Sequence, residues 1–197
     1  MTVAKNRLMT LEEYLDYDDG TDAAYELVDG ILVEMTAEVD INILIEGFLV
    51  SIFLQFLPHY CIRRGTEIVV AGRFANTRVP DILVLTEEGV AALPGNKRSM
   101  VMFEMPAPAL AVEVVSSSDT NRASRERDYT RKKNEYAQRE IPEYWIVDPI
   151  LAVVWVLTLV DGVYQEAKFV GDEGVRSLKF PDLGLSAEQI LAAGMPV

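Results

Sequence analysis

The stretch TRVPDILVL, residues 77–85, places a proline and an ionisable aspartate at the start of an apolar run. The stretch PALAVEVVSSS, residues 108–118, is similar, because Glu113 stands among Ala and Val residues. A charge in a buried strand costs several kcal/mol, roughly 3–5, unless another group compensates it. Two carboxylates on neighbouring strands repel one another and are stabilised by a divalent cation between them. The two stretches therefore predict a pair of strands that carry metal ligands.

The composition limits the classes of protein to consider. The chain has 197 residues, half of them hydrophobic and a quarter charged, which is typical of one globular domain. The single cysteine, Cys61, excludes an intramolecular disulfide and a cysteine-based zinc cluster, and the single histidine, His59, excludes a two-histidine metal site. No apolar stretch reaches the roughly 20 residues of a membrane span, and the N-terminus lacks a signal-peptide core. We expect a cytoplasmic protein with no membrane partner.

The net charge of −13 argues against binding nucleic acid through a broadly basic surface. A local basic cluster partly offsets this deficit. It lies between residues 122 and 133 and consists of Arg122, Arg125, Arg127, Arg131, Lys132 and Lys133. Binding of nucleic acid would therefore depend on this local cluster of basic side chains.

Local patterns predict an α/β (α+β) fold with one mixed central β-sheet flanked by helices. Thr10 followed by Glu13 is a capping-box pattern that predicts a short helix, and Asp-Gly pairs at 29–30 and 161–162 predict hairpins. Apolar spacing predicts a long, mostly buried helix over 40–58. A polar amphipathic helix is expected over 117–142. The remaining expected strands are 60–72, 77–88, 108–118, 143–149, 152–170 and 174–184.

The two carboxylates have alternative interpretations. Asp81 at a strand start is about as often a turn or cap residue as a ligand, and Glu113 could form a salt bridge to an arginine. For Glu113 the metal hypothesis is stronger because the neighbouring segment offers a second carboxylate. Mg²⁺ binds through one or two carboxylates, water and a substrate phosphate. Such a site suits phosphodiester hydrolysis.

A lysine near these carboxylates would orient water or neutralise developing charge. In the predicted helix, Asp128, Lys132 and Tyr136 are spaced four apart and share one face, while Lys133 points about a quarter-turn away. The alternative for this run is a solvated charged face, which is what most such runs are.

Four stretches in this order resemble a known family. They are YELVDGILVEM, RVPDILVL, PALAVEVVSSSDT and RDYTRKKNEYAQREIPEYWIVDP. Together they resemble the Uma-type endonucleases, once catalogued as a domain of unknown function, within the PD-(D/E)xK restriction-endonuclease-like superfamily. The resemblance runs from about Thr10 to Leu191. It implies a single restriction-endonuclease-like domain over 1–197, with its core at about 10–191, and a Mg²⁺-dependent endonuclease that hydrolyses DNA phosphodiester bonds.

The resemblance also implies a set of metal ligands. Asp81 corresponds to the aspartate of the Pro-Asp motif and Glu113 to the acid of the second motif. Both would bind Mg²⁺, for which Mn²⁺ could substitute. The backbone carbonyl of Val114 would be a further ligand, and Glu26 corresponds to an upstream glutamate that approaches the same site.

The chain departs from the superfamily pattern at two places. Val115 stands where the superfamily has its lysine, and the resemblance implies that Lys132 replaces this lysine from the following helix. The family often carries a histidine shortly after the first hairpin, whereas residues 35–42 contain none. A histidine-assisted role is therefore not expected.

The partners follow from the same resemblance. We expect nucleic acid, in the first place DNA, as the substrate and a homodimer as the assembly, because nucleases that cut both strands often act as two-fold dimers. The main alternative is a catalytically weak or inactive nuclease-fold protein that acts as a binding or regulatory subunit. A phosphoesterase for other substrates or a structural dimer is a third interpretation.

Overall fold

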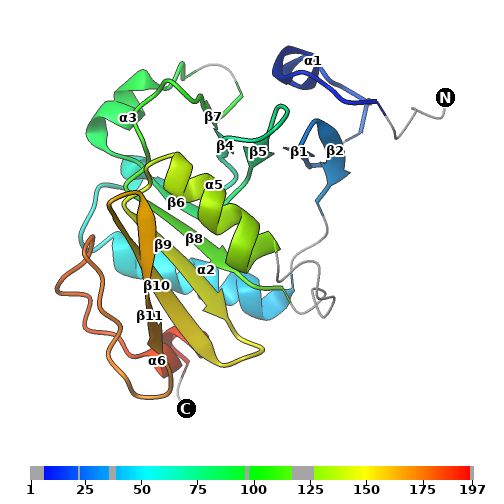
Figure 1. The fold of residues 1–197 in the computed structure, drawn as a ribbon. Helices are drawn as coiled ribbons and strands as arrows, with labels where there is room; N and C mark the ends of the chain where they lie inside the picture. The colour runs from blue at the N-terminus through cyan, green and yellow to red at the C-terminus, as the bar shows by residue number, and fades with distance from the viewer. Residues whose placement is uncertain (1–6, 22, 36–38, 96–97, 117–126, 196–197) are drawn as a thin grey trace.

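The structure is a computed structural model of the 197-residue chain, and it describes all residues except 1–6, 22, 36–38, 96–97, 117–126 and 196–197. A six-stranded sheet lies at its centre (Figure 1). Its strand order is β11 (Val163–Phe169), β10 (Val153–Val160), β9 (Glu143–Asp148), β8 (Leu110–Val114), β6 (Ile82–Val84) and β3 (Ile62–Arg63). Only β8 and β9 pair in parallel, and the other pairs in this sheet are antiparallel. The predicted mixed sheet is confirmed.

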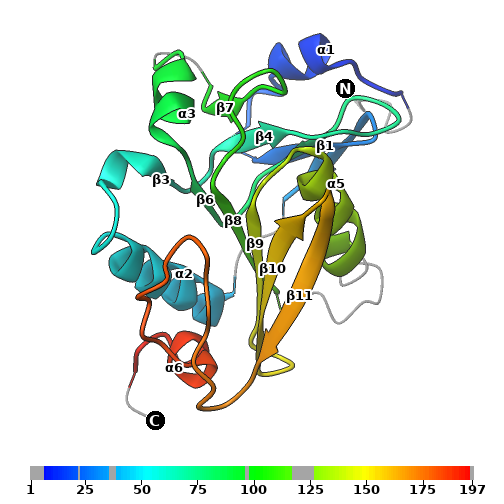
Figure 2. The same cartoon turned by 60° about the vertical axis from the view of Figure 1, so that its left-hand side comes forward.

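Helices flank the sheet on both faces (Figures 1 and 2). The helices α2 (Asp40–Phe53) and α6 (Ala187–Leu191) pack on one face, where Val112 and Val114 of β8 join their hydrophobic core. The helix α5 (Lys133–Gln138) covers the other face, where Ala111 and Val115 join a second core. The strand β8 is buried on both faces, as its apolar sequence predicts.

A smaller layer formed mainly by the N-terminal half of the chain lies beside the upper end of the sheet (Figure 2). It contains α1 (Leu11–Leu15), the hairpin β1 (Tyr25–Val28) and β2 (Ile31–Glu34), and a three-stranded sheet of β5 (Thr77–Arg78), β4 (Glu67–Val69) and β7 (Met100–Val101). The helix α3 (Glu87–Ala92) follows β6. Both reciprocal hydrogen bonds of the predicted capping box are present at Thr10. Asp29 and Gly30 both have positive φ, as the predicted hairpin turn requires.

The stretch 77–85 is divided between two sheets, which corrects the single strand expected there. Its first two residues form β5 in the three-stranded sheet, whereas Ile82–Val84 form β6 in the central sheet. Proline has no N–H to donate to a strand ladder, so pairing is interrupted at Pro80. Pro80 and Asp81 form the junction at which the chain passes from one sheet to the other.

The long helix predicted over 40–58 ends at Phe53 and is buried along one face only. Leu44 and Phe56, which belong to the apolar pattern of this predicted helix, are 42% and 40% exposed. Two polar residues, Asn42 and Glu46, lie instead on the buried face.

Two further segments differ from expectation or fall partly outside the described residues. Of the helix expected over 117–142, the structure describes a π-helical turn Arg127–Lys132 followed by α5. Residues 117–126, with Arg122 and Arg125, lie outside the described residues. The strand expected over 174–184, all of which is described, is wrong, because this segment makes only an isolated bridge between Gly174 and Ser186. None of the helices in the described part of the chain is long and apolar enough to cross a membrane.

Candidate active site

Glu113 lies in the middle of the central sheet and is only 4% exposed. Two side chains from the helical segment on that face bind its carboxylate. The Lys132 ammonium donates to Oε2 at 2.7 Å, and the Tyr136 hydroxyl donates to Oε1 at 2.7 Å. Lys132 is itself 5% exposed, so the ion pair is buried. The four-residue spacing places both donors on one helix face, as the sequence predicts.

The environment of Tyr136 keeps its hydroxyl protonated. Burial, followed by the negative charge of Glu113, raises the pKa of Tyr136 well above its ordinary value. The negative charge of Glu26 contributes further to raising this pKa. The phenol therefore acts as a permanent hydrogen-bond donor that fixes the orientation of Glu113.

Asp81 lies beside Glu113 on the neighbouring strand. In the antiparallel pair of β6 and β8, Ile82 is opposite Val112, and extending this register by one residue places Asp81 opposite Glu113. Directly opposite residues of an antiparallel pair project from the same face. Asp81 Oδ2 accepts a hydrogen bond from the backbone N–H of Val114 at 2.5 Å, which holds its carboxylate against β8.

The other two residues inferred from the resemblance have defined contacts. Glu26 on β1 is 6% exposed, and its Oε1 accepts a hydrogen bond from the backbone N–H of Val79 at 2.9 Å. This bond ties the hairpin to the junction that carries Asp81. The carbonyl oxygen of Val114 accepts a hydrogen bond from the Asn42 side-chain amide of α2 at 3.1 Å.

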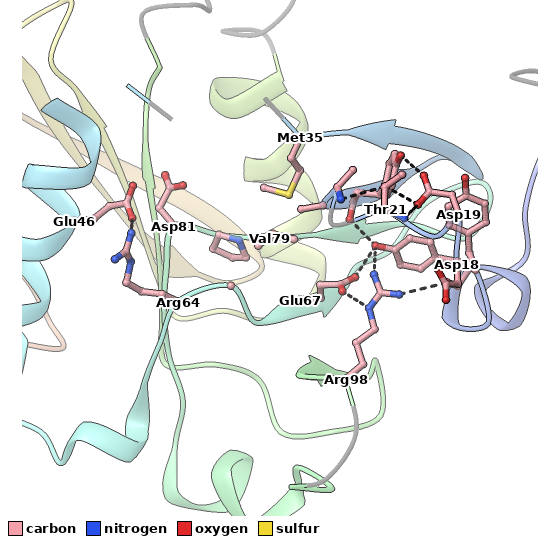
Figure 3. Close-up of a pocket in the computed structure, with 17 residues that line it drawn as sticks. Asp18, Asp19, Thr21, Met35, Glu46, Arg64, Glu67, Val79, Asp81 and Arg98 are labelled. Atoms are coloured by element: carbon pink, nitrogen blue, oxygen red, sulfur yellow. Dashed lines mark hydrogen bonds and ion pairs between the residues drawn. The ribbon is translucent and has the colours of Figure 1, made fainter. Parts of the chain in front are cut away.

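A cavity of about 420 Å³ opens beside Asp81 (Figure 3). Five acidic and two basic side chains contribute to its lining: Asp18, Asp19, Glu46, Glu67, Asp81, Arg64 and Arg98. Figure 3 shows two ends, with Glu46, Arg64 and Asp81 gathered at one and Asp18, Asp19 and Arg98 at the other.

Sequence reasoning missed Glu46 and Arg64 as site residues. Glu46 on α2 is only 1% exposed and forms an ion pair with Arg64, which follows β3. The available signal was a carboxylate within the apolar pattern of α2, four residues after Asn42, which is also buried. Only the pairing of β3 with β6 brings Arg64 next to Asp81.

The donor atoms at this site fit a hard divalent cation. Asp81 and Glu113 offer carboxylate oxygens and Val114 offers a carbonyl oxygen, which are the ligand types that Mg²⁺ prefers. Within the described residues, no group of three or more His, Cys, Asp and Glu side chains is placed to hold a metal ion. Since Mg²⁺ commonly uses only one or two carboxylates, a two-carboxylate set is compatible with it.

Several other sequence features have structural roles or lie outside the description. Tyr144 and Trp145 are both fully buried and pack in the two hydrophobic cores of the sheet. Lys133 forms an ion pair with Glu166 on the edge strand β11 and does not approach Glu113. The side chain of Asp128 lies outside the described residues.

The mixed central sheet flanked by helices is a restriction-endonuclease-like fold, which the following comparisons support. The Uma2 family model, described as "Putative restriction endonuclease", matches residues 11–188, and the chain belongs to this family. A crystal structure described as "a putative nuclease belonging to DUF820" from Anabaena variabilis has a similar fold, with a TM-score of 0.71 and 20% sequence identity. The match covers 95% of this chain and 99% of that one. A search of curated proteins found no match.

Proposed function

We propose that this protein is a Mg²⁺-dependent endonuclease that hydrolyses DNA phosphodiester bonds. The observation that carries the proposal is the hydrogen bond that joins Asp81 to the N–H of Val114, directly after Glu113 on β8, together with the binding of Lys132 to Glu113. Membership of a family described as restriction endonucleases supports the same reaction class.

Asp81, Glu113 and the carbonyl of Val114 would hold the cation, and Mn²⁺ could substitute because it accepts the same oxygen ligands. When bound, the metal polarises a phosphoryl oxygen and lowers the pKa of a bound water. Asp81 is pre-oriented for this role by the backbone N–H of Val114. Glu26 steadies the junction before Asp81 through its bond to Val79.

Lys132 would supply the positive charge that Val115 cannot. Its ammonium lies at Oε2 of Glu113, so it partly neutralises the acidic site and holds Glu113 in one orientation. A charge placed there also stabilises the negative charge that develops on the phosphate in the transition state. Tyr136 fixes the other carboxylate oxygen.

The test compares Asp81→Asn and Glu113→Gln with Glu166→Gln, a matched change at an exposed ion pair. Purified variants would be incubated with supercoiled plasmid and single-stranded oligonucleotides in Mg²⁺, in Mn²⁺ and with a chelator. We expect the site variants to lose on the order of 10²–10³ in rate and Glu166→Gln to retain the wild-type rate. Cleavage by Asp81→Asn at the wild-type rate would contradict the proposal.

One observation favours the alternative of a non-catalytic nuclease-fold subunit. Acidic side chains outnumber basic ones in the cavity lining, whereas a nucleic-acid site is expected to be basic. Absence of metal-dependent cleavage by the wild-type protein on every substrate tested, together with retained nucleic-acid binding, would support this alternative.

A homodimer stays a prediction. The hairpin of β10 and β11 carries exposed apolar side chains, including Val160 at 39% and Val163 at 66%. The late hydrophobic strands to which these residues belong, or alternatively the long apolar helix α2, would supply the interface. Light scattering at micromolar concentration checks the prediction, and a monomer would contradict it.

A further inference from the structure

Arg64 is the cation at the Asp81 end of the cavity. It lines the cavity together with Asp81, and Figure 3 shows both side chains beside Glu46. The Arg64 side chain is 46% exposed, whereas that of its partner Glu46 is 1% exposed. The ion pair therefore has one buried member and one member that reaches solvent at the mouth of the site.

The second basic residue that lines the cavity, Arg98, is bound to two other lining residues, Glu67 and Tyr14. It forms an ion pair with Glu67, and its Nη2 donates to the Tyr14 hydroxyl at 2.7 Å. Its guanidinium also lies 4.3 Å from the centre of the Tyr14 ring. These contacts hold Arg98 at the end of the cavity away from Asp81.

We propose that Arg64 is a substrate-contacting residue that binds a phosphate of the nucleic acid next to Asp81, and that Glu46 positions it. This inference rests on the proposed function, because it deepens the same site. A guanidinium has five N–H donors in a rigid fork, so it can bind a carboxylate on one side and a phosphate on another. In a chain with a net charge of −13, one cation fixed beside the acidic site favours the approach of an anionic backbone at that point.

Because Arg64 forms an ion pair with Glu46, its structural role must be tested separately from a role in binding substrate. Removing only the arginine would leave a buried carboxylate without its countercharge, which destabilises a protein by itself. Replacing both residues by glutamine removes the two charges together. The double variant therefore tests whether Arg64 serves only Glu46 or also the substrate.

The experiment measures binding in the Asp81→Asn background, so that cleavage does not interfere. Fluorescence anisotropy with a labelled duplex oligonucleotide, over a range of salt concentrations, would compare Arg64→Gln, Glu46→Gln and the double variant. The matched control is Arg63→Gln, the preceding residue, which lines a different cavity that lacks Asp81. Thermal melting followed by circular dichroism reports folding.

We expect Arg64→Gln and the double variant to bind about tenfold more weakly or worse, the usual effect of losing a charged hydrogen bond. The slope of log K against log salt should fall by about 1, because one phosphate contact is lost. Glu46→Gln keeps an acceptor oxygen for Arg64 and should weaken binding less than Arg64→Gln does, whereas Arg63→Gln should leave both the affinity and the slope unchanged. A purely structural arginine would not alter the slope.

Three results would overturn the inference. They are an unchanged slope for Arg64→Gln, recovery of binding in the double variant, or no measurable binding by the Asp81→Asn protein. Failure of this inference can be distinguished from failure of the proposed endonuclease function, because one is measured by binding and the other by cleavage. An Arg64-dependent slope in a protein that never cleaves would retain the phosphate contact and reject the endonuclease.

Discussion

Two buried glutamates lie on adjacent strands of the central sheet and have opposite kinds of partner. Glu113 on β8 is 4% exposed and is bound by the ammonium of Lys132, the last residue of the π-helical turn, and by the hydroxyl of Tyr136 on α5. Glu143 on β9 is 1% exposed and lies on the other face, two residues before Trp145. One carboxylate is thus paired with a cation, and the other is bound by neutral groups.

Glu143 binds the segment that follows the last hairpin to the central sheet, because three of its four hydrogen-bond donors come from residues 177–179. The four donors are the indole N–H of Trp145, the hydroxyl of Ser177 and the backbone N–H groups of Leu178 and Lys179. None of these four donor groups carries a charge, and none is a second carboxylate. The difference teaches that burial of a carboxylate in a sheet does not by itself indicate a reactive site. A second carboxylate opposite it and a nearby cation distinguish Glu113.

The largest expected effect is on the reaction, at Lys132. Lys132→Met should lower DNA cleavage on the order of 10²–10³ in rate, because it removes a transition-state charge contact. It should also lower stability, since Glu113 loses its buried countercharge. Lys133→Met is the matched control, because its partner Glu166 is on the surface and such pairs contribute about 0–1 kcal/mol. If the wild-type protein cleaves DNA and neither Lys132→Met nor Lys133→Met lowers the cleavage rate, the proposed role of Lys132 is wrong.

The next largest effect is on stability alone, at Glu143. Glu143→Ala should lower the free energy of unfolding by roughly 3 kcal/mol or more, because several buried donors lose a charged acceptor. Glu143→Gln keeps one acceptor oxygen and should be milder. Urea denaturation measures both. A Glu143→Ala protein with normal stability, or with impaired cleavage by its folded fraction, would erase the contrast with Glu113.

A smaller effect is expected at Tyr136. Tyr136→Phe removes the donor to Glu113 Oε1 while keeping the ring, so it should cost about 1.5–3 kcal/mol of stability. The cleavage rate should fall less than in Lys132→Met, because Lys132 still orients Glu113. Urea denaturation and the plasmid assay check the two parts. A rate loss greater than that of Lys132→Met would make Tyr136 the more important partner.

The smallest effect appears only at alkaline pH. Burial raises the pKa of Tyr136 well above its ordinary value, and burial also raises the pKa of Tyr14 and of Tyr164. The folded state therefore binds more protons than the unfolded state above the unfolded tyrosine pKa of about 10. Stability should be insensitive to these groups below that pH and should fall as pH rises beyond it. Urea denaturation at increasing pH measures the fall, which should be shallower in Tyr136→Phe.

Much of the local structure could be predicted because it depends on neighbouring residues. The two hairpin turns form where Asp-Gly pairs supply positive φ, at Asp29 and Gly30 and again at Asp161 and Gly162. The capping box at Thr10 needs only Glu13 three residues later. The meeting of Lys132 and Tyr136 at Glu113 follows from helical spacing together with the burial of β8.

The departures from prediction arise where a distant group satisfies the backbone. Residues 174–184 have the composition of a strand, yet Glu143 accepts hydrogen bonds from Leu178 and Lys179, so these N–H groups do not join a sheet. The expected strand over 77–88 is divided because Pro80 cannot donate and the N–H of Val79 binds Glu26 instead. Both partners lie more than thirty residues away in the chain.

The sequence by itself determined the capping-box helix, the two Asp-Gly hairpins, the buried run around Glu113, the Pro-Asp motif and the family to which the chain belongs. Those features depend on periodicity, turn chemistry and motif order, which are local properties of the chain. Only the tertiary structure decided that Asp81 accepts a hydrogen bond from the N–H of Val114 and that Glu46 is buried in an ion pair with Arg64. The same holds for the hydrogen bond from the N–H of Leu178 to Glu143. Each of these contacts joins residues far apart in sequence, because a buried polar group binds whichever partner the packed fold brings within hydrogen-bonding distance.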